Sequence, residues 1–390
     1  MTNTKLYKDI AARTGGDIYI GIVGPVRTGK STFIKKFMDT LVLPNISEEY
    51  VRERATDELP QSAAGRTIMT TEPKFIPETA VDMTLDGVCN MSVRLVDCVG
   101  YIVPSALGYI EDEKPRMVKT PWFDEEIPFN MAAEIGTKKV ITEHSTVGIV
   151  VTTDGSIGEI DRGEYEEAEE RVINELKEIN KPFVVLLNST HPKSDETAEL
   201  AKALCERYSV KVIPVDCLGL GQEDIKEILT EMLYEFPVKD INFFCPKWIN
   251  FLSPDHWLKE SIYSTVRDFS KNITKIREAR AAATALSENE YVTEAALCSA
   301  DLGTGSLSVE LSLEASLFYK VLTEQSGFEI SDEQELMSTL SKLSDIQKKY
   351  SRVKNALDEV EATGYGIVMP DVEEMTLAEP EIMKQGGQYG

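Results

Sequence analysis

The sequence predicts an α/β protein with a mostly parallel sheet, followed by a smaller α+β domain rich in long helices. Up to Pro237, short apolar runs rich in β-branched residues alternate with amphipathic helical patterns. Alternation of this kind indicates parallel strands connected by helices that cover both faces of the sheet. After Pro237 the alternation stops and long helical patterns take over. We therefore expect a first domain over residues 1–236 and a second domain over residues 237–390.

The first predicted strand leads directly into a glycine-rich loop. Residues 18–23 are apolar, residues 24–31 read Gly-Pro-Val-Arg-Thr-Gly-Lys-Ser, and residues 32–41 follow a helical pattern. The loop fits G-x-x-x-x-G-K-[ST], and its flanking strand and helix separate a phosphate loop from the alternative, a plain glycine turn. Its backbone N–H groups and the helix N-terminus form an anion cradle. The sequence thus predicts a GTPase-like phosphate-loop NTPase domain that binds a nucleoside triphosphate.

The other elements of the first domain follow the same rhythm. Strands are predicted at residues 91–97, 146–153, 182–188 and 210–215, and helices at residues 132–143, 165–179, 196–208 and 222–236. Sheets built in this way bind nucleotides at the carboxyl ends of their strands. Residues 101–130 break the rhythm with prolines, an acidic cluster and two aromatic residues, Trp122 and Phe123. We expect a functional insertion beside the nucleotide site, with a passive surface insertion as the alternative.

Three patterns define the second domain. Residues 255–287 predict one long helix, residues 307–313 alternate like a strand with one wet face, and residues 333–361 predict another long helix that Gly364 ends. The last helix carries an apolar stripe at helical spacing, formed by Leu336, Leu340, Leu343, Ile346, Tyr350, Val353, Leu357 and Val360. Such a stripe is typical of a packing face rather than of a cofactor site.

Composition bounds the class of protein. The chain has 390 residues, of which 42% are hydrophobic and 27% charged, and this is ordinary for a globular protein of two or three domains. The net charge of −25 argues against a protein that grips nucleic acid by its phosphates, and it disfavours direct docking on anionic lipid. Such acidity also serves plain solubility. We therefore expect no nucleic-acid partner.

Cysteines and histidines point away from disulfides and zinc. The six cysteines are scattered without a C-x-x-C pair, and they are expected to be buried, reduced thiols of an intracellular protein. The three histidines lack zinc-site spacing, so Mg²⁺ is the only metal expected. The first residues lack an apolar signal core, and no apolar run approaches membrane-spanning length. A cytoplasmic protein is expected.

The phosphate loop supplies most of the expected nucleotide contacts. Lys30 is placed to reach the β- and γ-phosphates, and Ser31 to ligate Mg²⁺. The remaining contacts are expected from the loop backbone and the start of the helix, at Gly24, Arg27, Thr28, Gly29 and Thr32.

A second motif follows the strand predicted at residues 91–97. The four residues from Asp97 to Gly100 fit D-x-x-G, in which the aspartate holds Mg²⁺ through water and the Gly100 amide senses the γ-phosphate. Alone this pattern is weak. After a phosphate loop, at a plausible separation and on its own strand, it becomes a strong indication of the same NTPase class.

Between the two motifs, residues 68–73 contain Thr70 and Thr71. A hydroxyl from such a segment commonly ligates Mg²⁺ in GTPase-like folds, and either threonine can serve, while a loop threonine without this role is the alternative. The expected catalytic set is Lys30, Asp97, Thr70 and Thr71, and the expected Mg²⁺ ligands are Ser31, Thr71 and Asp97.

The guanine-reading motif of GTPases is incomplete. At the place of N-K-x-D, residues 188–191 read Asn-Ser-Thr-His, so Asn188 remains as an expected nucleotide contact but His191 replaces the aspartate. That carboxylate accepts hydrogen bonds from guanine, and without it the site loses its main means of rejecting adenine. The sequence therefore predicts a GTPase-like fold that uses ATP and Mg²⁺ as its cofactors.

The residue after Gly100 is also informative. Tyr101 stands where many small GTPases have a glutamine that orients the attacking water. Intrinsic hydrolysis is therefore expected to be slow, and to depend on a group supplied by the insertion or by a neighbouring subunit.

Several stretches, spread along most of the chain, resemble one family. They are residues 9–17, 26–37, 57–65, 68–75, 95–101, 133–137 and 363–367. On these stretches the chain resembles the stage IV sporulation protein A family, the coat-morphogenetic ATPase of endospore-forming bacteria. The resemblance implies a GTPase-like domain that hydrolyses ATP, with hydrolysis driving irreversible self-assembly into a static polymer.

The resemblance also implies a location and partners. The polymer would coat the outer forespore membrane on the mother-cell side, as the platform for the spore coat. Family members are anchored by a small amphipathic membrane peptide and recruit other spore-coat morphogenetic proteins. They also carry a C-terminal region beyond the point that corresponds to Gly390, and this region is expected to be absent here.

Matching motif positions carry the family's functional residues over to this sequence. Lys30 and Ser31 correspond to phosphate-loop residues, Asp97 to the Mg²⁺ aspartate, and Thr70 and Thr71 to sensor threonines.

Two other classes compete with an ATPase scaffold. A regulatory GTPase of ribosome assembly or signalling would be expected to keep an intact N-K-x-D and often a basic RNA-binding face, and the sequence shows neither. A structural protein that never cleaves its nucleotide is disfavoured, because Lys30, Ser31 and Asp97 are all present.

Overall fold

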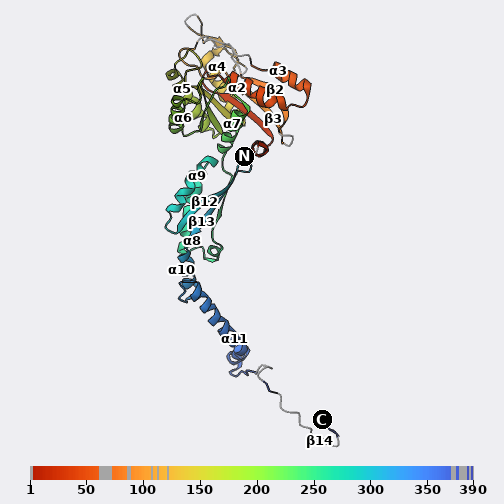
Figure 1. The fold of residues 1–390 in the computed structure, drawn as a ribbon, viewed down its shortest axis with the longest axis vertical. Coiled ribbons are helices and arrows are strands. Elements are labelled where there is room, and N and C mark those ends of the chain that lie inside the picture. Colours follow the sequence, from red (N-terminus) through yellow and green to blue (C-terminus); the bar gives the residue numbers. More distant parts are fainter. Residues whose placement is uncertain are drawn as a thin grey trace. The chain divides into compact units, whose positions relative to one another are not determined.

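The computed structural model describes residues 3–60, 73–85, 89–106, 109–111, 114–120, 123–369, 375–376, 384–385 and 388–389. The chain divides into two compact units at the Ser312–Leu313 junction, and each unit is described by itself. The first unit holds the predicted α/β domain and a small second sheet (Figure 1).

The centre of the first unit is a six-stranded sheet with the strand order β10-β9-β8-β1-β3-β2 (Figure 1). Its strands are β1 (Asp17–Val23), β2 (Lys74–Leu85), β3 (Cys89–Asp97), β8 (Val147–Thr153), β9 (Phe183–Asn188) and β10 (Val212–Val215). Every neighbouring pair is parallel except β2 and β3, which are antiparallel. The mostly parallel sheet confirms the predicted α/β class.

Helices cover both faces of this sheet, as predicted (Figure 1). They are α1 (Asn3–Thr14), α2 (Lys30–Phe37), α3 (Glu49–Asp57), α4 (Phe129–Glu143), α5 (Glu166–Glu178), α6 (Asp195–Tyr208) and α7 (Gln222–Tyr234). One turn of π-helix, Met38–Val42, continues α2, so the helix predicted at residues 32–41 is confirmed with a change of hydrogen bonding at its end. Each predicted strand and helix of the first domain is present, and most bounds shift by no more than three residues.

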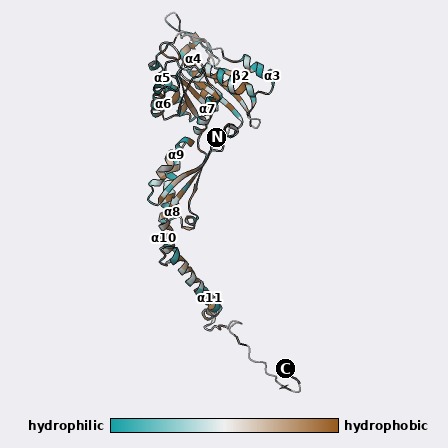
Figure 2. Ribbon diagram, viewed as in Figure 1, coloured by the Kyte–Doolittle hydropathy of each residue, from teal (hydrophilic) through white to brown (hydrophobic). Residues whose placement is uncertain are grey.

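Alternate strand residues build the core on each side of the sheet. Val23, Val96, Val150 and Val185 belong to one buried cluster with apolar residues of α4, α5 and α6. On the other face, α1 and α7 contact each other and the strands between them. Figure 2 shows apolar residues gathered on the strands between these helices. Strands buried on both faces explain why they appear in the sequence as continuous apolar runs rather than as alternating ones.

The segment after Gly100 contains four short strands, β4 (Ile110–Glu111), β5 (Lys114–Pro115), β6 (Met117–Val118) and β7 (Ile127–Pro128). They pair two by two, β4 with β5 and β6 with β7. The segment then leads into α4. Phe129, the first residue of this helix, donates its N–H to the Arg116 carbonyl, and its side chain is buried. The described part of the predicted insertion therefore consists of short paired strands, and its end is anchored in the core by Phe129.

A three-stranded sheet with the order β11-β13-β12 follows the first domain. It consists of β11 (Asp240–Phe244), β12 (Val292–Asp301) and β13 (Ser306–Leu313), with β13 as the predicted strand. The helices α8 (Trp257–Asn272) and α9 (Ile276–Ala285) precede β12. Cys298 on β12 is exposed, which corrects the expectation of buried thiols, whereas Cys89, Cys98 and Cys217 are buried; all six cysteines are free.

The prediction of one helix over residues 255–287 is wrong, because the chain breaks between α8 and α9. Ile273 is extended, with φ −100° and ψ 117°. The backbone N–H groups of Thr274 and Lys275 both donate to Glu278 Oε2, at 2.9 and 3.0 Å. Glu278 thus caps the start of a new helix, and this local hydrogen bonding replaces a continuous helical ladder.

The second unit contains α10 (Ala315–Ser326) and α11 (Glu333–Thr363), then a short pair, β14 (Lys384–Gln385) and β15 (Gln388–Tyr389). The predicted stop at Gly364 is confirmed, since its φ is +83° and its N–H donates to the Val360 carbonyl. Within the described segments, no helix has both the length and the apolar character needed to cross a membrane.

Candidate nucleotide-binding site

The phosphate loop joins the carboxyl end of β1 to the start of α2, where parallel strands present their ends. Gly29 has φ +95°, and a Cβ added there would lie 2.3 Å from Asn188 Nδ2. Gly100 has φ +92°, and a Cβ there would lie 2.3 Å from the Gly24 carbonyl oxygen and 2.6 Å from Lys30 Nζ. Both positions therefore require glycine, and they keep the loop backbone open for close approach of an anion.

The side chain of Lys30, the first residue of α2, folds back into the phosphate loop that precedes it. Its side chain is 6% exposed, and Nζ donates to the Pro25 carbonyl at 2.6 Å and to the Gly24 carbonyl at 3.4 Å. Burial lowers the pKa of this ammonium, and the nearby charge of Asp97 opposes that shift. A buried cation of this kind gains from the arrival of negative charge, as a triphosphate would supply.

Ser31 and Asp97 meet across the two motifs. The parallel register pairs Ile22 of β1 with Asp97 of β3, which brings the end of β3 next to the start of α2. Ser31 Oγ donates to Asp97 Oδ2 at 2.7 Å. Burial raises the pKa of Asp97, while the hydrogen bond from Ser31 and the charges of Lys30 and Lys74 partly offset the shift.

These residues fit a magnesium-bound triphosphate. Asp97 Oδ1 is buried and has no hydrogen-bond partner among the described residues, so one oxygen is left for a ligand or for a metal-bound water. A hydroxyl and a carboxylate are oxygen donors, which Mg²⁺ prefers. Ser31 and Asp97 would hold the ion, and Mg²⁺ bound there would neutralise charge on the phosphate oxygens.

The backbone of Tyr101, next to Gly100, binds the second motif to the phosphate loop. Val26 N–H donates to the Tyr101 carbonyl at 2.8 Å, and Tyr101 N–H donates to the Gly24 carbonyl at 3.2 Å. The Tyr101 side chain is buried, with its hydroxyl donating to Glu175 and the Arg171 guanidinium 5.3 Å from its ring centroid. Burial and the Glu175 carboxylate raise the pKa of Tyr101. The Tyr101 side chain thus packs against α5 and does not orient water at the phosphates.

Asn188 positions the loop through both ends of its amide. Nδ2 donates to the Thr28 carbonyl at 2.9 Å, and Oδ1 accepts from Cys217 N–H at 3.0 Å. The side chain is 4% exposed. Asn188 therefore ties the phosphate loop to the turn between β10 and α7.

The remaining predicted contacts lie on the same loop. Thr28 is buried and donates from Oγ1 to the Pro25 carbonyl at 3.0 Å. Arg27 has φ +63°, and burial lowers the pKa of its guanidinium. Thr32 lies in the first turn of α2 and is partly buried. Every described residue of the predicted set is thus found at the carboxyl ends of β1, β3 and β9, on the phosphate loop or in the first turn of α2.

Thr70 and Thr71 lie outside the described residues. The chain is described again from Pro73, and Lys74 at the start of β2 pairs in register with Asp97. The first described strand after these threonines therefore begins beside the proposed metal site.

At the position where a GTPase would bind guanine, the side chains and backbone of the loop after β9 are hydrogen-bonded to one another. His191 N–H donates to Ser189 Oγ at 2.9 Å, and His191 Nδ1 lies 2.9 Å from Thr190 Oγ1. Nearby, Asp154 accepts from Ser156 N–H at 2.9 Å and from Ser156 Oγ at 2.6 Å. Although burial opposes it, these bonds hold the pKa of Asp154 below its ordinary value. Both side chains are thus engaged in local hydrogen bonding.

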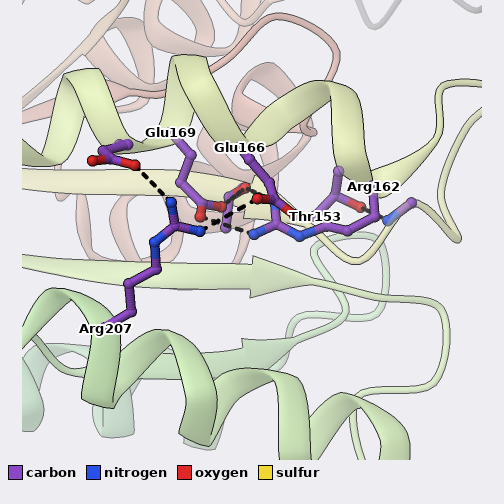
Figure 3. Close-up of polar contacts among 8 residues, drawn as sticks. Thr153, Arg162, Glu166, Glu169 and Arg207 are labelled. Atoms are coloured by element: carbon purple, nitrogen blue, oxygen red, sulfur yellow. Dashed lines mark hydrogen bonds and ion pairs between the residues drawn. The ribbon is translucent and has the colours of Figure 1, made fainter.

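A buried ion pair, which sequence reasoning missed, supports the loop after β8 (Figure 3). Glu169 on α5 is fully buried, and it accepts from Arg162 Nη2 at 2.8 Å and from the Thr152 hydroxyl. Figure 3 also shows Arg207 reaching Glu166, at 3.3 Å. A buried carboxylate needs a partner, so Arg162 fixes the end of the loop formed by residues 154–161.

That loop lies against the phosphate loop, and the root of the insertion contacts the turn at the end of that loop. A Cβ at Gly29 would lie 3.8 Å from Ile157 Cδ1, so residues 154–161 pass against the phosphate loop. Ser105 donates to Glu164 from its backbone N–H at 2.8 Å and from Oγ at 2.6 Å. The root of the insertion is therefore bound to the turn that carries Arg162.

Replacing Asn188 with alanine is expected to lower the free energy of unfolding by about 2 kcal/mol, because Cys217 N–H and the Thr28 carbonyl then stay buried without a partner. The loosened loop should raise the KM for ATP more than it lowers kcat. Urea unfolding and steady-state kinetics check this, with Asn174→Ala on the exposed side of α5 as the matched control. Unfolding and KM values equal to those of the parent would show that Asn188 does not position the loop.

Comparison with known proteins identifies two matching regions. Residues 1–237 match the family described as Stage IV sporulation protein A, ATPase domain, and residues 238–390 match Stage IV sporulation protein A, middle domain. Curated relatives named Stage IV sporulation protein A are similar along the chain. The protein of Clostridioides difficile (strain 630) is 49% identical over 388 residues, and those of Bacillus anthracis and Bacillus subtilis (strain 168) are each 48% identical over 390 residues.

Each of these alignments covers 100% of this chain and 79% of the relative. These matches confirm the resemblance that the sequence showed. They favour an ATPase over the alternative, a regulatory GTPase, because the matched domain is the ATPase domain of the family. The intact phosphate loop, the Ser31–Asp97 contact and these matches agree. The chain belongs to the stage IV sporulation protein A family and is an ATPase of that family.

Proposed function

We propose that this protein is an ATP-hydrolysing cytoskeletal scaffold that self-assembles into a static polymer on the forespore surface and forms the base of the spore coat. The observation that supports it is the assembled site, in which Lys30, Ser31 and Asp97 meet at the ends of β1 and β3. The residues that would bind the triphosphate and Mg²⁺ are also those that phosphate-loop NTPases use to stabilise transfer of the γ-phosphate. The ATPase family and the sporulation names of its relatives supply the biological setting.

Each site residue has a role in this proposal. Lys30 neutralises charge on the β- and γ-phosphates, and Ser31 and Asp97 hold Mg²⁺, with Thr70 or Thr71 as a further ligand. Gly100 presents its backbone amide to the γ-phosphate. Turnover is slow because the Tyr101 side chain is buried against α5, so water must be oriented by the insertion or by a neighbouring subunit.

The proposed location follows from charge and from the family resemblance. With a net charge of −25, the chain would be repelled by an anionic bilayer, so attachment is proposed to be indirect, through a small amphipathic membrane-anchoring peptide. We place the polymer at the outer forespore membrane on the mother-cell side, where it recruits other spore-coat morphogenetic proteins. The ATPase domain is proposed to comprise residues 1–236, and the assembly domain residues 237–390.

The conformational change on ATP hydrolysis is proposed to be transmitted from the nucleotide site to the assembly surfaces by loops that begin at the site. The insertion follows Gly100 and begins at Tyr101, whose backbone is hydrogen-bonded to the phosphate loop, and Ser105 near its start is hydrogen-bonded to Glu164. A segment that orders on ATP and is released on hydrolysis is a known switching device, and it drives assembly only if the two states expose different interfaces. Residues 101–130 are therefore the proposed relay.

Replacing Thr70 and Thr71 together with alanine is expected to leave ATP bound, to reduce hydrolysis by on the order of 100-fold, and to block polymer formation. Binding, turnover and pelletable polymer are measured on the same preparation, in a chain that carries the family's C-terminal region. Polymer formed normally by an enzyme that no longer cleaves ATP would refute the coupling and leave nucleotide as a structural ligand.

A further inference from the structure

Residues 9–17, one of the stretches that carry the family resemblance, lie outside the nucleotide site, at the end of α1 and the start of β1. Two of their side chains, Asp9 and Arg13, contact the turn between β12 and β13. We call residues 238–312, which hold β11, α8, α9, β12 and β13, the sheet module. It belongs to the same compact unit as the ATPase domain.

Arg13, in the last turn of α1, is enclosed by the turn between β12 and β13. Its Nε donates to the Leu302 carbonyl at 2.5 Å, and its guanidinium carbon lies 5.4 Å from the centroid of the Phe236 ring. Gly305 has φ +82°, and a Cβ added there would lie 2.4 Å from Arg13 Nη1. This position therefore requires glycine, and the turn fits closely around the guanidinium.

Asp9, one turn earlier on α1, contacts the same turn. It is 8% exposed, and a Cβ added at Gly303 would lie 2.8 Å from Asp9 Oδ1. The turn is held in shape by Asp301, whose Oδ1 accepts from Gly303 N–H at 3.0 Å. Its other side is bound to the start of the sheet module, since Lys239 N–H donates to the Gly305 carbonyl at 3.0 Å. The turn thus connects α1 to the chain that leaves the ATPase domain.

A second contact between the ATPase domain and the sheet module is an ion-paired carboxylate at the end of α7. The Glu235 side chain is almost fully buried, with Oε2 accepting from Lys275 Nζ at 2.8 Å and Oε1 from Arg277 Nη1 at 2.5 Å. Both cations lie at the start of α9. Between them, Ile276 N–H donates to the Phe236 carbonyl at 3.3 Å. Both carboxylate oxygens are therefore used to hold α9 against α7.

The two contacts together restrict how the sheet module can move. One chain crossing, residues 236–239, joins it to the ATPase domain, and a polar interface around a single crossing ordinarily permits relative motion. Here the contacts lie on two different helices, α1 and α7, and they hold two different parts of the module, the turn and α9. Rotation about the crossing would break at least one of them. A buried carboxylate that loses its partners is costly, so such rotation is opposed.

Helix α7 connects the second contact to the nucleotide site. Just before it, Cys217 N–H donates to the Asn188 amide, which in turn donates to the Thr28 carbonyl of the phosphate loop. The helix then runs to Tyr234, directly before Glu235. Its packed face is formed by Ile225, Ile228, Leu229, Met232 and Leu233, all buried. One rigid element thus extends from the tether of the phosphate loop to the sheet module.

We propose that Arg13 and Glu235 form a two-point joint that holds the sheet module in one orientation on the ATPase domain. The joint lies outside the group formed by Lys30, Ser31 and Asp97, so ATP is cleaved without it. In the self-assembly proposed above, on which this second step rests, the fixed orientation is what passes the conformational change on hydrolysis to the assembly domain. Breaking the joint therefore separates ATP turnover from polymer formation.

The orientation is measured as a distance distribution between two spin labels, by double electron–electron resonance on the full chain. One label is placed on Cys298, which is exposed on β12, and the other on a cysteine replacing the exposed Lys202 on α6. The partly buried Cys205 and Cys245 are replaced by serine, and the other cysteines are buried. The parent should give a single narrow distribution.

Two variants break the joint to different degrees. The first carries Arg13→Met and Glu235→Gln, which remove both points. The second carries Arg13→Lys, which keeps the charge but loses the guanidinium fork, and Arg277→Met, which leaves Glu235 paired with Lys275. Because the second leaves no buried carboxylate unpaired, it is expected to fold even if the first does not. Each folded variant should broaden the distribution about twofold or more.

Turnover and polymer are measured on unlabelled chains, with pelletable polymer assayed as for the threonine variant. Both joint variants should hydrolyse ATP within about twofold of the parental rate and should pellet on the order of tenfold less polymer. The matched control is Arg52→Met with Glu53→Gln, both exposed on α3. It should behave like the parent in every measurement, and circular dichroism checks that helix content is unchanged.

Each outcome bears on one step. A broad distribution in the parent, or one as narrow in the second variant as in the parent, would overturn the joint. Loss of ATP turnover in the second variant, or normal polymer from a loosened chain, would overturn its role in coupling. A parent that cleaves ATP and forms no polymer would count against the proposed function, and a narrow distribution in that parent would leave the joint standing.

Discussion

Replacing Asp97 with asparagine is expected to lower ATP turnover by on the order of 100-fold or more while sparing much of the ATP binding. Ser31 Oγ can still donate to the remaining oxygen of the amide, so the local structure survives. The change removes the negative charge that would hold Mg²⁺ and replaces one oxygen with an N–H donor. Single-turnover hydrolysis and binding of a fluorescent ATP analogue measure the two effects separately.

The matched control for this substitution is Asp268→Asn, an exposed carboxylate on α8. It should hydrolyse ATP at the parental rate. If Asp97→Asn and Asp97→Ala both kept that rate, the D-x-x-G assignment would be a chance match, and the Ser31–Asp97 contact would be purely structural.

Replacing Lys30 is expected to abolish tight ATP binding, because no other described side chain of the loop brings an ammonium among the loop carbonyls. Lys30→Met retains most of the side-chain volume and removes the charge. Since burial already lowers the pKa of this ammonium, the unliganded variant should unfold at the same temperature as the parent or higher. The stabilisation by saturating ATP, about 2.7 kcal/mol at 100 times Kd, should disappear.

Thermal unfolding with and without ATP checks this pair of effects, with Lys35→Met on the exposed side of α2 as the control. Lys30→Ala should lose binding in the same way. An ATP-dependent rise in unfolding temperature equal to that of the parent would contradict the role given to Lys30.

The parts of the site that sequence reasoning found are those encoded locally. Strand, glycine loop and helix follow one another directly around Lys30, and Asp97 ends an apolar strand, so two local motifs predicted that Ser31 and Asp97 belong to one site. Their direct hydrogen bond is a finding of the structure. The parallel sheet was predictable for the same reason, because its buried strands are continuous apolar runs.

The parts it missed depend on contacts between distant segments. Sequence reasoning gave Asn188 a nucleotide contact, which stays a prediction, but it did not find that the Asn188 amide links Thr28 to Cys217, because no local pattern records that Cys217 lies beside it. Arg162 and Glu169 carry charges typical of a solvated helix face, and only the folded chain shows that Glu169 is buried.

Some failures had a signal in the sequence. A Thr-x-x-x-Glu pattern, Thr274 and Glu278, marks the break between α8 and α9 in the sequence, although the helical periodicity continues across it. The Thr274 hydroxyl donates to Glu278 in the structure. Strand β2 is not among the predicted strands. Pro77 lies within it, and its pairing with β3 is irregular between Ile76 and Val81. A proline is tolerated there because β2 is an edge strand.

We propose that an ATPase site without a guanine-reading carboxylate drives self-assembly. The most direct measurement compares steady-state hydrolysis of ATP and GTP, with sedimentation of polymer from the same reactions. We expect ATP to be preferred, since His191 and its loop offer no carboxylate for guanine, and we expect polymer to pellet only where ATP is cleaved. A clear preference for GTP, or polymer that forms equally without hydrolysis, would contradict the account.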